Sequence, residues 1–114
     1  MTTLNVETEQ LNAYVENLDN MVAYQEDAIV SKIIANKKTG TVTMFAFDEG
    51  QGVSEQSLPF DSVLFVTDGE MEITLGEDDP KLVGSDEMIY IPAGTAHIVT
   101  GSSSFKMFSI MIRS

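Results

Sequence analysis

The chain has 114 residues and a formal net charge of −12 at pH 7, because its 18 Asp and Glu residues outnumber its 6 Lys and Arg residues. This length fits a single domain with one hydrophobic core. The charge disfavours nucleic acid and anionic membranes as partners, since both would repel the protein. The sequence contains no cysteine, which excludes disulfides, thiolate metal sites and cysteine nucleophiles and fits a reducing compartment.

The sequence shows neither a secretory signal nor a membrane-spanning segment. No basic residue precedes Lys32, so a positively charged signal-peptide region is missing and we expect a cytoplasmic protein. The stretch 88–105 has no charged residue, but Pro92, Gly94 and Gly101 interrupt it, which disfavours a membrane helix.

Residues 1–24 are predicted to form an N-terminal helical segment, and residues 25–114 the barrel domain. Apolar residues recur at the spacing of one helix face, which predicts an amphipathic helix within about residues 5–22. That face consists of Leu11, Tyr14, Val15, Leu18 and Val22. We expect this helix to cover exposed barrel surface or to be exchanged between subunits.

After Ala28 the pattern changes to short β-branched and aromatic runs separated by turn residues, which is typical of an all-β sandwich or barrel. The runs are Ile29–Ile34, Thr41–Phe47, Val63–Thr67, Met71–Leu75, Met88–Ile91, His97–Thr100 and Phe105–Ile112.

Asp68-Gly69 suits a two-residue hairpin turn, in which Val66 would pair with Met71. One face of this predicted hairpin is apolar and consists of Leu64, Val66, Met71, Ile73 and Leu75. Val63 and Phe65 lie on the other face and need a cover, either the N-terminal helix or a second subunit. The sequence therefore predicts a homodimer.

From Gly50 onward the residue spacing resembles that of the cupin superfamily, whose first motif is G-x5-H-x-H-x3-E-x6-G. The stations of its two histidines, its glutamate and its last glycine hold Gln56, Leu58, Ser62 and Gly69. The second motif, P-x-G-x2-H, is matched by Pro92-Ala93-Gly94-Thr95-Ala96-His97, whereas its opening glycine is Asp86 and its terminal asparagine is Gly101. The resemblance covers about residues 32–112 and is greatest to small bacterial single-domain cupins of undetermined activity.

This resemblance implies a double-stranded β-helix, which is a jelly-roll barrel around a central pocket. Metal-dependent cupins hold their ion with three histidines and a glutamate, but only His97 remains of that set here. Leucine cannot coordinate, and serine and glutamine are weak neutral donors. We therefore predict no tightly held metal; the alternative is a weakly bound divalent transition metal on His97 and Gln56.

The predicted ligand pocket consists of Gln56, Leu58, Ser62, Leu64 and His97. His97 either packs as a satisfied semi-buried histidine or contacts a ligand, and Gln56 could fix its tautomer. Strand alternation directs Glu55 and Asp61 away from this pocket. Acid–base chemistry of the sugar-epimerase type would need an aspartate and a tyrosine beside the histidine, and Tyr90 is the tyrosine of the barrel region.

The sequence thus predicts a metal-free barrel that binds a small molecule. The alternative is a divergent metal-dependent cupin enzyme, of dioxygenase or isomerase type, that uses His97 and Gln56. A third reading is an oligomeric or regulatory component that acts through the outer face of a sheet.

Overall fold

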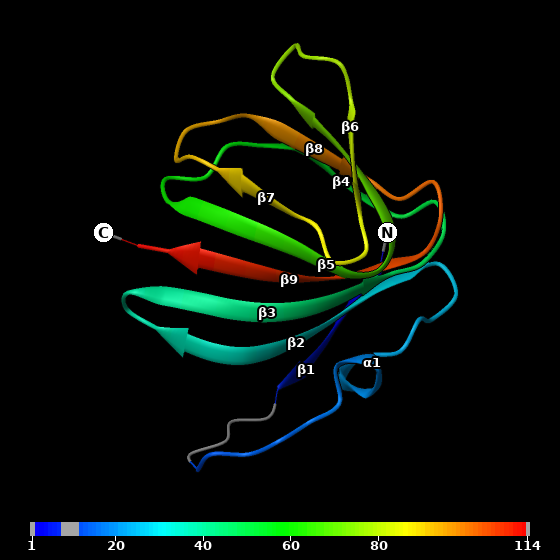
Figure 1. Ribbon diagram of the computed structural model, residues 1–114, viewed down its shortest axis with the longest axis vertical. Coiled ribbons are helices and arrows are strands. Elements are labelled where there is room, and N and C mark those ends of the chain that lie inside the picture. Colours follow the sequence, from blue (N-terminus) through cyan, green and yellow to red (C-terminus); the bar gives the residue numbers. More distant parts are fainter. Residues whose placement is uncertain (1, 8–11, 114) are drawn as a thin grey trace.

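The computed structural model describes residues 2–7 and 12–113 and confirms the all-β prediction. Among these residues, no helix is long and apolar enough to cross a bilayer. The elements, shown in Figure 1, are β1 (Thr2–Glu7), α1 (Leu18–Met21), β2 (Ala28–Lys37), β3 (Gly40–Phe47), β4 (Gly52–Gln56), β5 (Asp61–Leu75), β6 (Lys81–Gly84), β7 (Met88–Ile91), β8 (His97–Thr100) and β9 (Phe105–Ile112).

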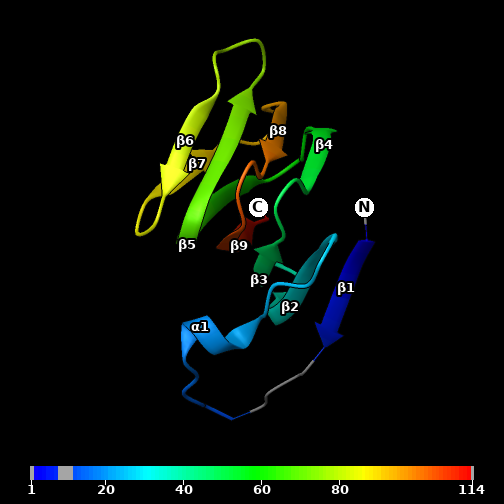
Figure 2. The same ribbon diagram turned by 90° about the vertical axis from the view of Figure 1, so that its right-hand side faces the viewer.

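The strands form two sheets that share β5. The first half of β5 pairs with β9 and β7, and β9 continues through β3 and β2 to β1. The second half of β5 pairs with β6 and with β8, which pairs in turn with β4. Figure 2 shows the two layers facing each other. All pairings are antiparallel except that of β1 with β2, and the arrangement is a jelly roll.

The prediction of a hairpin turn at Asp68-Gly69 is wrong, because strand β5 continues through this dipeptide and the chain does not reverse its direction. Val66 faces Met107 on β9 and Asp68 faces Lys106, so Thr67 is an extra residue, a β-bulge. The two halves of β5 pair with other strands rather than with each other, and the bulge lets the strand bend from one sheet into the next.

The predicted inner face of β5 is nevertheless correct. Leu64, Val66, Met71 and Ile73 are buried and Leu75 is half-buried. Val66 and Met71 are five positions apart, so regular alternation would direct them to opposite faces. The extra residue shifts the alternation by one position, which brings both side chains into the barrel.

The hydrophobic core fills the end of the barrel next to this bend. Phe47 and Phe105 stack there, with ring centroids 4.5 Å apart, and are almost completely buried. The other buried members of this core are Ile29, Leu64, Val66, Met71, Ile73, Val83, Ile91, Val99 and Met107.

The predicted N-terminal helix is mostly wrong. Residues 5–7 belong to strand β1, residues 8–11 lie outside the described part, and residues 12–17 are not helical. Only Leu18–Met21 form a helix, with the Asn17 side chain accepting a hydrogen bond from the Asp19 backbone N–H. Leu11 of the predicted apolar face lies outside the described residues; of the described members, Tyr14, Val15 and Leu18 are exposed and Val22 is buried.

Contacts with the barrel explain why this segment is extended rather than helical. Val22 packs on Val30, Met44 and Ala46, which lie on the outer face of β2 and β3. The Lys32 ammonium also forms a salt bridge of 2.9 Å to a Glu16 carboxylate oxygen. Isolated helices of this length are marginal in water, so such contacts outweigh the helical periodicity.

A second group of contacts fixes the segment to β9 and to the bend of β5. The buried Lys106 ammonium donates to the Asp19 carbonyl oxygen at 2.8 Å and lies 5.1 Å from the centroid of the Tyr24 ring. The Tyr24 hydroxyl donates to Asp68 Oδ2 at 2.6 Å. Burial and this hydrogen bond to a carboxylate raise the Tyr24 pKa. The segment therefore covers one part of the outer barrel surface.

Gly69→Ala is expected to destabilise the protein far more than Gly50→Ala. Both glycines have positive φ, +74° and +81°, so a side chain costs about 1 kcal/mol at either site. At Gly69 an added Cβ would also overlap the Ser104 carbonyl oxygen, whereas at Gly50 it would meet nothing within 4 Å. Urea unfolding should therefore show an additional loss of about 2 kcal/mol for Gly69→Ala. Equal losses would show that the close approach at the bend is unimportant.

Candidate functional site at the far end of the barrel

The strand register places polar side chains at the end of the barrel away from the bend. On one sheet Gln56 pairs with His97, which also pairs with Leu75. On the other sheet Ser62 pairs with Met111. His97 and Ser62 are each 4% exposed. The barrel interior thus changes from apolar beside the bend to partly polar at this end.

His97 has a hydrogen-bond partner at each ring nitrogen. Nδ1 lies 3.0 Å from the Thr95 carbonyl oxygen, and Nε2 lies 3.4 Å from Gln56 Nε2. A carbonyl oxygen can only accept, so Nδ1 carries the proton of the neutral ring and Nε2 accepts from the Gln56 amide. This arrangement leaves Gln56 Oε1 as an acceptor for another group.

The second motif forms the turn that positions His97. Gly94 has φ +81°, and its N–H donates to the Leu58 carbonyl oxygen at 2.8 Å. The Ala93 N–H donates to Asp61 Oδ1 at 2.8 Å. Both bonds tie the turn to the connection between β4 and β5, so the Thr95 carbonyl is held against the imidazole.

Asp86 occupies the station of the opening glycine of this motif and has φ +68°. Its N–H donates to the Val66 carbonyl oxygen, and the Val66 N–H donates to the Glu87 carbonyl oxygen, both at 2.9 Å. The motif's backbone conformation is therefore kept here by an aspartate, a residue type that tolerates positive φ better than most.

The residues at the metal stations do not fit a transition-metal ion. Gln56 contacts His97, Ser62 lies buried on the inner face of β5, and Leu58 is half-buried in the loop after β4. Across the described residues, no three His, Asp or Glu side chains are grouped closely enough to hold an ion. One imidazole, one amide and one hydroxyl lack the charge and donor strength that such sites need.

Tyr90 and Asp61 form a pair, but on the outer face of the barrel. Their neighbours Ile91 and Ser62 are buried inside, so alternation directs Tyr90 and Asp61 outward. Hydrogen bonds from the Tyr90 hydroxyl and the Ala93 N–H lower the Asp61 pKa, and the bond to Asp61 raises the Tyr90 pKa. An aspartate and a tyrosine are thus present, yet this pair does not join His97 in an epimerase-type site.

Two hydroxyl residues that lie inside the barrel were not predicted from the sequence. Thr43 and Ser109 face each other across β3 and β9, on the same sheet face as Ser62. Thr43 lies four positions before the buried Phe47, and Ser109 four positions after the buried Phe105, so strand alternation could have placed both residues on the inner face. A hydroxyl residue at an inward position of a strand is unusual and points to a polar interior.

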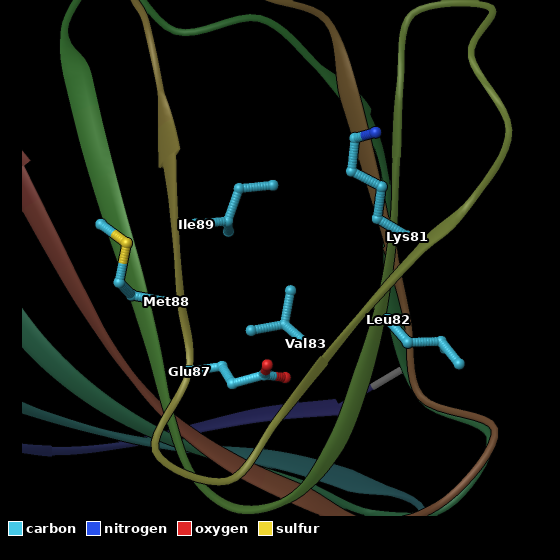
Figure 3. Close-up of a pocket in the computed structure, with 6 residues that line it drawn as sticks. All are labelled: Lys81, Leu82, Val83, Glu87, Met88 and Ile89. Atoms are coloured by element: carbon cyan, nitrogen blue, oxygen red, sulfur yellow. The ribbon is translucent and has the colours of Figure 1, made fainter.

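A cleft of about 200 Å³ lies elsewhere, where the two sheets separate between β6 and β7 (Figure 3). Val83 and Ile89 project into it, whereas Leu82 points away. Its remaining lining residues are Lys81, Glu87 and Met88. None of the predicted pocket residues lines this cleft, so the prediction that Gln56, Leu58, Ser62, Leu64 and His97 share a ligand site stays a prediction.

Solved structures resemble the whole chain. A conserved protein of unknown function from Streptococcus pyogenes matches with a TM-score of 0.85 and 24% identity, over 100% of this chain and 96% of its own. A cupin superfamily protein from Desulfitobacterium hafniense matches with a TM-score of 0.82 and 24% identity, over 93% of this chain and 94% of its own. The chain has the cupin fold.

A cupin 2 conserved barrel domain protein from Leptotrichia buccalis is 31% identical, with a TM-score of 0.81. The match covers 86% of this chain but only 47% of that longer chain. No family model matches the sequence, and no curated protein does. The likeness therefore establishes the fold, and the chemistry has to be argued from the site.

The neutral His97 ring is expected to be the Nδ1–H tautomer, because Nδ1 faces the Thr95 carbonyl oxygen. Long-range ¹H–¹⁵N NMR on the single histidine should show a protonated Nδ1 and an unprotonated Nε2 at alkaline pH. Gln56→Leu should leave this assignment unchanged, since the Thr95 contact remains. Finding the proton on Nε2 would contradict the deduced Gln56 orientation.

Proposed function

We propose that this cupin barrel binds a small organic molecule without a resident metal. The ligand would lie between the Gln56–His97 pair on one sheet and Ser62 on the facing sheet, with Leu58 and Leu64 as apolar contacts. The observation that carries the proposal is the state of His97, whose two nitrogens are occupied by the Thr95 carbonyl and the Gln56 amide. The lack of cysteine supports a cytoplasmic location.

The competing function is a divergent metal-dependent enzyme of dioxygenase or isomerase type. It would require the Gln56 amide to turn its oxygen toward an ion that His97 Nε2 also binds, with water or substrate completing the coordination. Such a site would bind weakly, since metal affinity depends on the number and charge of the ligands.

Metal content separates the two functions. After incubation with equimolar Zn²⁺, Ni²⁺, Mn²⁺ or anaerobic Fe²⁺ and gel filtration, elemental analysis should find far less than one ion per chain. Gln56→His places a second imidazole beside the first and should increase Zn²⁺ and Ni²⁺ retention, which provides a positive control. Stoichiometric metal in the unmodified protein that His97→Ala removes would establish the competing function.

We also propose that two copies pair through the outer face of β5, β7 and β9. The N-terminal segment covers this face only near Lys106 and Phe108. The rest stays open, because Val63 and Phe65 are half-buried and Met88, Tyr90 and Ile112 are about half exposed. The acidic residues of this face are Asp61, at one end of β5, and Asp68, at the bend, and the positions between them carry none, although the chain carries −12 overall. Electrostatic repulsion between two copies of this acidic chain is weakest where the surface has few carboxylates. Apolar sheet faces are also typical of homodimer interfaces.

Met88→Lys should convert this dimer to a monomer, because it places a cation in the apolar face of each copy. Leu82→Lys is the matched control: Leu82 is 62% exposed, compared with 50% for Met88, but it lies on β6 in the other sheet. Light scattering at micromolar concentration should report a dimer for the unmodified protein and for Leu82→Lys. A monomeric unmodified protein, or dissociation by both substitutions, would contradict the proposed interface.

A further inference from the structure

We infer that the interior site takes an uncharged ligand with several hydroxyl groups, of the polyol or monosaccharide class. This inference rests on the proposed function and specifies the chemistry of the same site. It is carried by three hydroxyls on one wall of the barrel and by the lack of charged residues at the inward positions of β3, β5, β7, β8 and β9.

The three hydroxyls belong to Thr43, Ser62 and Ser109, on the adjacent strands β3, β5 and β9. The residues are only 6%, 4% and 8% exposed. Within the described part of the chain their side chains form no hydrogen bond, yet no buried side-chain oxygen there lacks a partner. Their oxygen atoms therefore border space that water can enter, although the residues themselves are more than nine-tenths buried.

That space lies inside the barrel. Thr43 is in register with Ser109, and Ser109 with Leu64, a residue of the core cluster. Ser62 is in register with Ile91, another buried residue of that cluster. All of these side chains share the sheet face that carries Phe105, so the hydroxyls point toward the opposite sheet. The register also places Ser62 at the same end of the barrel as His97.

The opposite sheet offers a complementary acceptor. Because the Gln56 amide nitrogen faces His97, Gln56 Oε1 is available to accept a hydrogen bond from a ligand hydroxyl. Serine and threonine hydroxyls can donate or accept, as ligand hydroxyls do, so the two sets can satisfy each other. The CH groups of such a ligand would pack on Leu64 and Ile91. An apolar ligand would instead displace water from these polar atoms without replacing its hydrogen bonds.

Charge excludes the main alternatives. At their inward register positions, β3, β5, β7, β8 and β9 hold no Asp, Glu, Lys or Arg, and Lys81 on β6, which pairs with Ile73, is exposed at the cleft between β6 and β7. A phosphate or carboxylate would therefore be buried without a cationic partner in a chain of net charge −12. A ligand ammonium would likewise find no carboxylate at the inward positions of these five strands.

NMR titration with matched probes tests this inference. Two polyols, myo-inositol and glucose, are compared with cyclohexanol, which keeps a six-membered ring but has one hydroxyl, and with myo-inositol monophosphate, which adds charge. The Leu64 and Ile91 methyl signals should shift with at least one polyol. Cyclohexanol and the phosphate should each bind at least tenfold more weakly than that polyol.

Two variants that each remove one hydroxyl test this wall directly. Thr43→Val and Ser109→Ala should each weaken polyol binding about fivefold, which is the loss of one neutral hydrogen bond of about 1 kcal/mol. Thr74→Val is the control, because Thr74 lies between the inward-facing Ile73 and Leu75 and points outward. Thermal unfolding shows whether each variant folds. If one of the two hydroxyl variants does not fold, polyol binding by the other one tests the inference.

The outcomes separate this inference from the function on which it rests. Tighter binding of cyclohexanol or of the phosphate at the same methyls overturns the polyol class but leaves a metal-free binding barrel. No methyl shift with either polyol also overturns the inference. Stoichiometric metal bound through His97 overturns the proposed function itself, whatever the polyols do.

Discussion

The bend of β5 is the constraint on which the rest of the structure depends. One strand belongs to both sheets, so the two sheets can enclose a core only where this strand turns from one to the other. Thr67 supplies the extra residue that keeps Val66 and Met71 on the same side, and Gly69 allows the backbone to approach Ser104. Everything at the far end of the barrel takes its register from this point.

The candidate site follows from this register and from the turn of the second motif. Ser62 and Leu64 face inward because Val66 does, and His97 faces them because its strand pairs with the second half of β5. The turn then holds a carbonyl against one nitrogen of His97, and Gln56 occupies the other. Of the four positions at which metal-dependent cupins carry their ligands, two thus hold the hydrogen-bonded pair Gln56 and His97, and the other two hold Leu58 and Ser62.

The sequence predicted the features that depend on alternation and on local turns. It identified the β-barrel, the inner face of β5 and the pairing of His97 with Gln56. It failed at Asp68-Gly69, since a hairpin turn and a bulged bend both favour glycine, and only the partner strands decide between them. It failed at Tyr14, Val15 and Leu18 because helical spacing does not reveal that barrel contacts hold the chain extended. Thr43 and Ser109 escaped notice because they belong to no motif.

The distribution of charge connects the interior with the outer face. Residues 62–67 of β5 and the strands β7 and β9 contain no Asp or Glu, although the chain has 18 of them. On β5, Ser62 and Leu64 line the interior while the intervening Val63 and Phe65 form the open outer face, so a single strand contributes to both. Burial of the outer face against a second copy would hold this strand rigid, and with it the wall that carries Ser62. A barrel without a metal to organise its ligands gains most from such a fixed wall, because binding then depends on the placement of neutral hydrogen-bonding groups.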